Sequence, residues 1–152
     1  MDYESYNINI IKILPNIFVG DQTIVNDENI LNTLNIKYLI NINNTVITNK
    51  FITLDINIDE TNDFIDSQEI YDVNFIITND FICKALLNNS NVLICYTNYT
   101  IPFLILGAFI LKYNDLTYTE CIYWLYYKFN LHNKMLSNKM IYQLFLYNKE
   151  LE

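Results

Sequence analysis

A short apolar run in the second half of the chain constrains the fold more than any other feature. Val92–Cys95 follows the turn-forming residues Asn88-Asn-Ser-Asn and holds only apolar side chains before its terminal thiol. Such a run is typical of a strand in the middle of a parallel sheet that is covered on both faces. After a short loop, Pro102 opens an apolar segment, and proline favours the first turn of a helix. The chain is therefore expected to contain a buried strand, a loop and a buried helix in direct succession.

Alternating apolar segments and turn residues fill the rest of the chain. Asn26-Asp-Glu and Thr117-x-x-Glu offer capping groups for helices. Mixed strands and helices followed by a helical second half predict an α/β domain with a central, mostly parallel sheet flanked by helices. At 152 residues the chain fits one domain, residues 1–152. The expected strands are Ile8–Leu14, Ile17–Val19, Lys37–Ile42, Phe51–Ile58 and Val92–Cys95, and the expected helices are one of about eight residues after Asn26, then Ser67–Leu87, Pro102–Tyr113, Tyr118–Phe129 and Asn138–Tyr147.

Charge and hydropathy narrow the classes of partner. The chain carries nine lysines, no arginine and seventeen carboxylates, a net charge of −8 that repels nucleic acid. The longest apolar run, Ile101–Leu111, is about half the length that a membrane span needs. No basic segment precedes an apolar signal region. We therefore expect an intracellular protein without a nucleic-acid or membrane partner.

The cysteine pattern favours neither disulfides nor metal. Cys83, Cys95 and Cys121 are widely separated and have no paired spacing, and His132 is the only histidine. A disulfide framework and a zinc site both need paired ligands. The sequence predicts neither a metal nor a cofactor.

Cys95 is the residue with the most suggestive chemistry. A thiol between a strand and a helix N-terminus is well placed to handle phosphate, because the unpaired helix N–H groups favour both thiolate and phosphate. A phosphate-clamping arginine would be expected six residues later, where this chain has Ile101. The segment looks like the frame of a cysteine phosphatase from which the anion-binding groups have been removed.

The order of segments along nearly the whole chain resembles one family. The segments that carry the resemblance are Ile13-Leu-Pro-Asn-Ile-Phe-Val-Gly20, Lys37–Ile42, a strand leading to an acidic loop at Asp59, a long helix, Val92–Cys95 and Gly107-Ala-Phe-Ile-Leu111. This order resembles that of the dual-specificity protein phosphatases, and the helical tail through Leu146 is most similar to the poxvirus members. The resemblance implies the cysteine-phosphatase fold and, for a viral protein, a place in the host-cell cytoplasm or the virion.

The family signature is degenerate in this chain. The signature is His-Cys, two residues, Gly, two residues, Arg and Ser or Thr, and only its cysteine is kept, as Cys95. The resemblance makes Cys95 a vestigial nucleophile and Asp59 a vestigial general acid, with Asp63 as the rival if the loop is shifted. The degenerate phosphate loop comprises Ile94 at the His position, Tyr96, Thr97, Asn98 at the Gly position, Tyr99, Thr100, Ile101 at the Arg position and Pro102 at the hydroxyl position.

Each replacement removes a specific interaction. Ile101 has neither the charge nor the bidentate donors of arginine, and Pro102 has no hydroxyl proton for the departing thiolate. Asn98 can still adopt the left-handed backbone conformation of a glycine. Tyr96 and Tyr99 add bulk to a loop that must stay open around phosphate.

Three functions follow from these residues. The leading one is a pseudophosphatase that binds a protein partner, a second copy of the chain included, and binds phosphate weakly or not at all. The alternative is an active protein-tyrosine or dual-specificity phosphatase, or an RNA 5′-phosphatase, that uses Cys95 with Lys128 or Lys134 in place of the arginine. The third is an oligomer-forming protein whose contact lies on the aromatic C-terminal helices.

Overall fold

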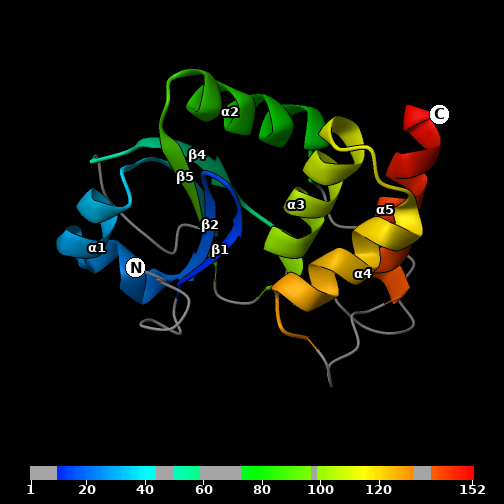
Figure 1. Cartoon of the computed structure of the whole chain (residues 1–152), viewed down its shortest axis with the longest axis horizontal. Coiled ribbons are helices and arrows are strands. Elements are labelled where there is room, and N and C mark those ends of the chain that lie inside the picture. Colours follow the sequence, from blue (N-terminus) through cyan, green and yellow to red (C-terminus); the bar gives the residue numbers. More distant parts are fainter. Residues whose placement is uncertain (1–9, 44–49, 59–72, 97–98, 132–137) are drawn as a thin grey trace. The chain divides into compact units, whose positions relative to one another are not determined.

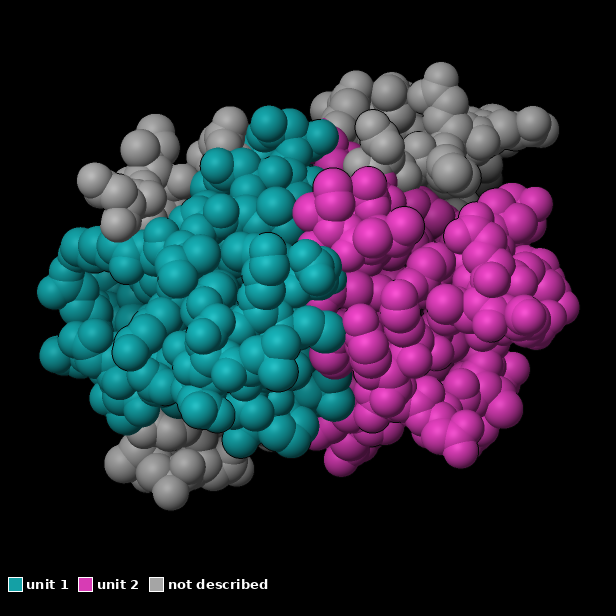
Figure 2. Space-filling model, turned by 90° about the horizontal axis from the view of Figure 1, so that it is seen from above, with its two compact units in different colours: residues 1–57, 80–102 teal, residues 58–79, 103–152 magenta. Residues whose placement is uncertain are grey.

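The chain divides into two compact units. The computed structural model describes residues 10–43, 50–58, 73–96, 99–131 and 138–152 (Figure 1). The first unit comprises residues 1–57 and 80–102, and the second comprises residues 58–79 and 103–152 (Figure 2). A single domain, expected from the chain length, stays a prediction.

A five-stranded sheet forms the centre of the first unit. Its strand order is β1-β2-β5-β3-β4, so β5 lies between two neighbours. β2 and β3 both run parallel to β5, β4 runs parallel to β3, and β1 is antiparallel to β2. The expected mostly parallel sheet is confirmed, with the run around Cys95 as its central strand. The strands are β1 (Ile10–Leu14), β2 (Ile17–Asp21), β3 (Ile36–Ile42), β4 (Ile52–Ile56) and β5 (Asn91–Tyr96).

The helices differ from the expected ones at several places. A short 3₁₀ helix after β2 was not expected, the helix expected to begin at Ser67 begins at Phe75, and the helix expected to begin at Pro102 begins at Thr100. The last helix continues four residues beyond the expected end at Tyr147. The helical elements are η2 (Gln22–Asn26), α1 (Glu28–Thr33), α2 (Phe75–Leu87), α3 (Thr100–Tyr113), α4 (Tyr118–Lys128) and α5 (Asn138–Leu151).

Local side-chain hydrogen bonds explain two of these differences. The Asp21 carboxylate accepts hydrogen bonds from the backbone N–H of Thr23, at 2.9 Å, and from its hydroxyl, which closes the first turn of η2. The Asn74 amide oxygen accepts from the backbone N–H groups of Ile76 and Ile77 at 3.1 and 3.2 Å. Asn74 therefore caps α2 and sets its first residue, since asparagine is a preferred helix cap. Residues 59–72 lie outside the described part of the chain.

Both faces of the sheet are covered within the first unit. On one face, η2 and α1 pack with Phe18, Leu39, Leu93 and Cys95 into a hydrophobic cluster. On the other face, the Tyr38 ring meets the Phe81 ring of α2 edge to face, with 5.6 Å between centroids, and the Tyr38 hydroxyl accepts a hydrogen bond from Asn88. A strand covered on both faces is apolar along its whole length, which is why β5 reads as a continuous hydrophobic run.

In the second unit, α3 packs closely on α4 and α5. A Cβ atom at Gly107 would lie 2.7 Å from Leu144 Cδ1 of α5 and 3.4 Å from Leu125 Cδ1 of α4. The Phe103 ring of α3 lies 5.6 to 5.7 Å from two aromatic rings of the α4 region, those of Tyr126 and Phe129. The glycine therefore allows the close approach of α5. Among the residues that the structure describes, no helix is long and apolar enough to span a lipid bilayer.

Asparagine occupies the left-handed backbone positions. Within the described ranges, every non-glycine residue with a positive φ is an asparagine, and no described glycine has a positive φ. The amide side chain tolerates this region because it is short and can form local hydrogen bonds. The five residues are Asn16, Asn35, Asn43, Asn89 and Asn130, with φ values of 72°, 53°, 56°, 53° and 57°.

Asn130 provides a test of this use of asparagine. It follows the end of α4, where its backbone N–H donates to the Tyr127 carbonyl at 3.1 Å and its side chain is exposed. Asn130→Ala should lower the free energy of unfolding by about 1–2 kcal/mol, because Cβ strains a left-handed residue, whereas Asn130→Gly should change it little. Urea unfolding of both variants measures this, with Asn114→Ala, an exposed asparagine without a positive φ, as the control. Equal losses for Asn130→Ala and Asn130→Gly would contradict the explanation.

Cys121 in the core of the second unit predicts alkaline instability. Burial raises the pKa of this thiol from about 9 to about 12, and its sulfur lies 3.8 Å from the Gly107 carbonyl oxygen. The unfolded chain loses the proton near pH 9 while the folded protein keeps it, so this contribution to stability is complete below pH 9 and is lost as the pH rises towards 12. The free energy of unfolding should therefore fall more steeply between pH 9 and 10.5 in the wild type than in Cys121→Ala. Parallel pH profiles of the two proteins in urea unfolding would contradict the assignment.

Candidate functional site

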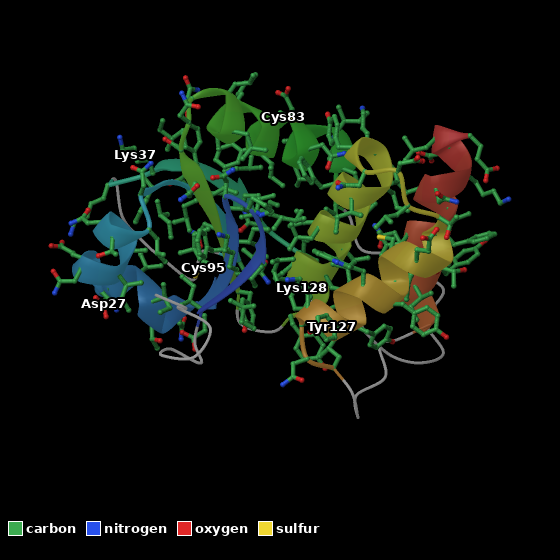
Figure 3. The ribbon with its side chains drawn as sticks, viewed as in Figure 1. Asp27, Lys37, Cys83, Cys95, Tyr127 and Lys128 are labelled. Carbon is green, nitrogen blue, oxygen red and sulfur yellow. The ribbon has the colours of Figure 1, made fainter. Side chains whose placement is uncertain are left out.

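The candidate site lies at the carboxyl end of the sheet, in the first unit. Cys95, near the end of β5, stands opposite Gly20 of β2 and Asn41 of β3. Asn41 in turn stands opposite Asp55 of β4, and its amide donates a hydrogen bond to the Asp55 carboxylate at 3.2 Å. Ligands of open α/β sheets bind beyond the carboxyl ends of the strands. The register therefore places Cys95 near the carboxyl end of the sheet, where such a fold binds its ligand (Figure 3).

The Cys95 side chain is enclosed. Its exposed fraction is 0%, and it belongs to the hydrophobic cluster between the sheet and the helices η2 and α1. Ile24 and Val25 of η2 are members of the same cluster. A nucleophile has to reach its substrate, and reactive cysteines lie in partially exposed, electropositive surroundings. The packing of Cys95 is that of an apolar core residue.

Apolar side chains also fill the flanking positions. Ile94, before the cysteine, and Ile101, at the start of α3, are both 0% exposed. Pro102 is buried as the third residue of α3 and has no N–H to direct at an anion. The first turn of a helix normally offers four unpaired N–H groups, so this helix has one donor fewer. The start of α3 is therefore packed with apolar side chains and offers one backbone donor fewer than usual.

The electrostatic surroundings disfavour negative charge. Tyr96 follows Cys95 and stands opposite Asp21 of β2. Burial raises the pKa of Tyr96 above its usual value, and the negative charges of Asp21 and of a Cys95 thiolate raise it further. The same burial and the same carboxylate would oppose a phosphate dianion at this position.

The lysines of the first unit do not offset this negative charge. Its described residues include four lysines, and the strand register places none of them beside Cys95. Lys37 is the second residue of β3, at the opposite end of that strand, and Lys12 stands on β1 opposite Phe18. Lys50 is paired with Glu28, and Lys84 is paired with Asp80 at 3.6 Å. The described part of this edge therefore carries the carboxylates of Asp21 and Asp55 without a lysine next to the thiol.

Several predicted site residues fall outside the described part of the chain. These are Thr97 and Asn98 of the loop, the acid candidates Asp59 and Asp63, and Lys134. Lys128 belongs to the second unit, where its Nζ atom lies 5.5 Å from the centroid of the Trp124 ring. The roles of Asp59 and of a substitute lysine stay predictions. Among the described residues no group of three His, Cys, Asp or Glu side chains is arranged to hold a metal ion.

Asp21 and the pair of Asn41 and Asp55 were not among the predicted site residues. Two of them had a signal in the sequence, since Asp21 is the charged residue that ends a buried strand and Asn41 interrupts the apolar run of β3. Asn41 is only 2% exposed, so its hydrogen bond to Asp55 satisfies a buried polar group. Only the strand order shows that these residues lie at the same end of the sheet as Cys95.

Comparisons with known proteins concern the fold of the chain. No family model and no curated protein sequence matches the chain. Its structure is similar to that of the human tyrosine phosphatase-like serine/threonine/tyrosine-interacting protein, with a TM-score of 0.76, 19% identity and coverage of 93% of this chain and 96% of the other.

Two further solved structures are similar in the same way. A leucine-rich repeat and phosphatase domain containing protein from Entamoeba histolytica matches with a TM-score of 0.75 and 18% identity, over 95% of this chain and 93% of the other. Human DUSP28 matches with a TM-score of 0.72 and 13% identity, over 94% and 95%. At such low identities the likeness concerns the fold. The fold expected from the sequence is confirmed: this chain has the α/β fold of the dual-specificity, cysteine-dependent phosphatases.

Proposed function

We propose that this chain is a pseudophosphatase, a dual-specificity phosphatase fold that does not transfer phosphoryl groups and instead binds a protein partner. The observation that carries the proposal is the complete burial of Ile101, to which the resemblance gives the position of the family's phosphate-binding arginine, close in sequence to an equally buried Cys95. Without a guanidinium the loop has no group that clamps the equatorial oxygens of a transferring phosphoryl group.

The expected loss of catalytic rate supports the proposal that the chain is inactive. Removal of one preorganised donor from an enzyme site typically lowers the rate by about 10²- to 10³-fold, and a charged bidentate donor contributes more. In this chain the arginine is absent, Pro102 lacks both N–H and hydroxyl, and Asp21 places a negative charge nearby. These effects act in the same direction, and no described lysine of the first unit stands beside Cys95 to oppose them.

The name of one structurally similar protein is consistent with a binding role. That human protein is described as tyrosine phosphatase-like and as serine/threonine/tyrosine-interacting. For this chain we propose a protein partner, a second copy included, at an intracellular site. The likeness to poxvirus members, and with it a place in the host cytoplasm or the virion, remains a prediction from the sequence.

Hydrolysis of a small aryl phosphate tests the proposal. The purified wild type should show no turnover above that of Cys95→Ser, its matched control, because neither protein can hold the phosphoryl group. Turnover by the wild type that Cys95→Ser abolishes would contradict the proposal and favour the alternative, an active protein or RNA 5′-phosphatase with a non-standard anion site.

A restored signature separates a missing charge from a distorted scaffold. We expect the variant Ile94→His, Asn98→Gly, Ile101→Arg and Pro102→Ser to gain hydrolysis that depends on Cys95. The same variant with Cys95→Ser is the control, and circular dichroism checks that both are folded. A folded variant without any gain would show that the loop differs from an active one in more than its side chains.

A further inference from the structure

β4 lies at one outer edge of the sheet in the first unit and directs a row of backbone groups away from the sheet. The strand order ends at β4, and no strand within the described ranges pairs with its outer side. Asn43, which follows β3, donates its backbone N–H to the Ile56 carbonyl at 2.6 Å, so the backbone groups of Ile56 point toward β3. Because these directions alternate along a strand, the N–H and C=O groups of Thr53 and Asp55 point outward. An edge strand of this kind is a template for pairing with another strand.

The opposite edge of the sheet is protected against such pairing, whereas β4 is not. β1 carries the exposed Lys12, and its register with β2 shifts between Lys12 and Leu14. A lysine and a bulge are two of the devices by which natural proteins block an edge strand. β4 has a regular register with β3, and its one charged side chain, that of Asp55, already accepts the hydrogen bond from Asn41. β4 is therefore the edge that is open to a partner strand.

We propose that β4 pairs antiparallel with β4 of a second copy of the chain, about a two-fold axis at Leu54, so that the two sheets join into one. In this register Thr53 of each copy stands opposite Asp55 of the other. Both residues direct their backbone groups outward, so each such pair exchanges both of its backbone hydrogen bonds. An isologous contact needs a self-complementary surface of this kind.

The side chains of β4 complement each other in this register. The Thr53 hydroxyl, which donates to the Phe51 carbonyl at 3.3 Å, can donate instead to the Asp55 carboxylate of the other copy. Ile52, which is 56% exposed, stands opposite Ile56 of the other copy and gains an apolar neighbour. An axis at Asp55 would set two carboxylates opposite each other, which destabilises a sheet, and an axis at Thr53 would set the carboxylate opposite Phe51. The residues of β4 therefore favour the first register.

This inference rests on the proposed function, in which a second copy is one of the binding partners, and it names the surface that binds. It places the contact on β4 of the first unit rather than on the C-terminal helices, where the sequence favoured it. Its test is the oligomeric state, whereas the test of the proposed function is hydrolysis. A dimer with turnover would contradict only the proposed function, and a monomer without turnover would contradict only this inference.

Sedimentation velocity of the full chain, at concentrations up to about 1 mM, measures the association. Salt at about 0.15 M screens charges more than about 8 Å apart, which limits the repulsion between two copies of net charge −8. Thr53→Pro removes an outward N–H and keeps the ladder with β3, a position at which an edge strand tolerates proline. It should weaken the dimer by about tenfold or more, because the loss occurs twice per dimer. Thr53→Val, which keeps the N–H and loses only the hydroxyl, should weaken it less.

Ile52→Lys and Leu87→Lys form a matched pair of variants. Each replaces an exposed apolar side chain, 56% and 82% exposed, with a lysine, and each makes the same change in net charge. Ile52→Lys should weaken the dimer by about fivefold or more, since it sets a lysine opposite Ile56 at both ends of the contact. Leu87→Lys, on α2, should leave the association unchanged. Circular dichroism verifies that all variants are folded.

Oxidative cross-linking tests the register of the two strands. The background variant is Cys83→Ser, because Cys95 and Cys121 are both fully buried. Leu54→Cys in this background places two thiols opposite each other at the axis, where Cα atoms of such a pair are about 4.5 Å apart and within disulfide range. Diamide should oxidise it to a covalent dimer. Ile56→Cys should stay uncrosslinked, because the two copies of residue 56 lie four strand positions apart, or about 13 Å.

Three results would overturn the proposal. A wild type that stays monomeric at about 1 mM would leave the edge of β4 to an extended segment of a different protein. Equal association of Ile52→Lys and Leu87→Lys would place the contact elsewhere on the surface, and this comparison decides if Thr53→Pro does not fold. Equal cross-linking of Leu54→Cys and Ile56→Cys would exclude the axis at Leu54.

Discussion

The enclosure of β5 between two parallel strands is the constraint on which the rest of the structure depends. β5 is apolar because the sheet is covered on both faces, and its neighbours β2 and β3 fix its register. That register sets Cys95 level with Gly20 and Asn41 at the carboxyl end of the sheet. α3 begins only a few residues later, so the same constraint places a helix N-terminus after the thiol. The frame of a phosphate site thus follows from how the sheet is buried.

The residues that strengthen this frame also leave it without polar groups of the family signature. Ile94 and Ile101 are fully buried, and burial of an isoleucine side chain stabilises a fold by about 1.5–3 kcal/mol. Buried polar or charged groups at the same positions would lower stability unless they were paired. A phosphatase accepts that loss because its arginine and histidine are needed for turnover. This chain has core residues there instead, and it has Asp21 beside Tyr96, which together support the proposed pseudophosphatase.

The parts of the fold that could be predicted are those set by local sequence. β5, the start of α3 near Pro102 and the capping box of α4 follow from apolar runs and caps. η2 and the late start of α2 depend on hydrogen bonds that the side chains of Asp21 and Asn74 accept, which periodicity does not reveal. Asp21 could not be placed beside Tyr96, because the two lie 75 positions apart and meet only through the strand order. Loop residues such as Asp59 and Asn98 fall outside the described chain, so their roles remain predictions.

The most direct test of the central claim is a calorimetric titration of the wild type with inorganic phosphate, with Cys95→Ser and Ile101→Arg titrated in parallel. A loop without a guanidinium, next to a carboxylate, should show no binding stronger than about 10 mM, and Ile101→Arg should bind more tightly than the wild type. Stoichiometric binding of phosphate by the wild type at micromolar concentrations, lost in Cys95→Ser, would contradict the account.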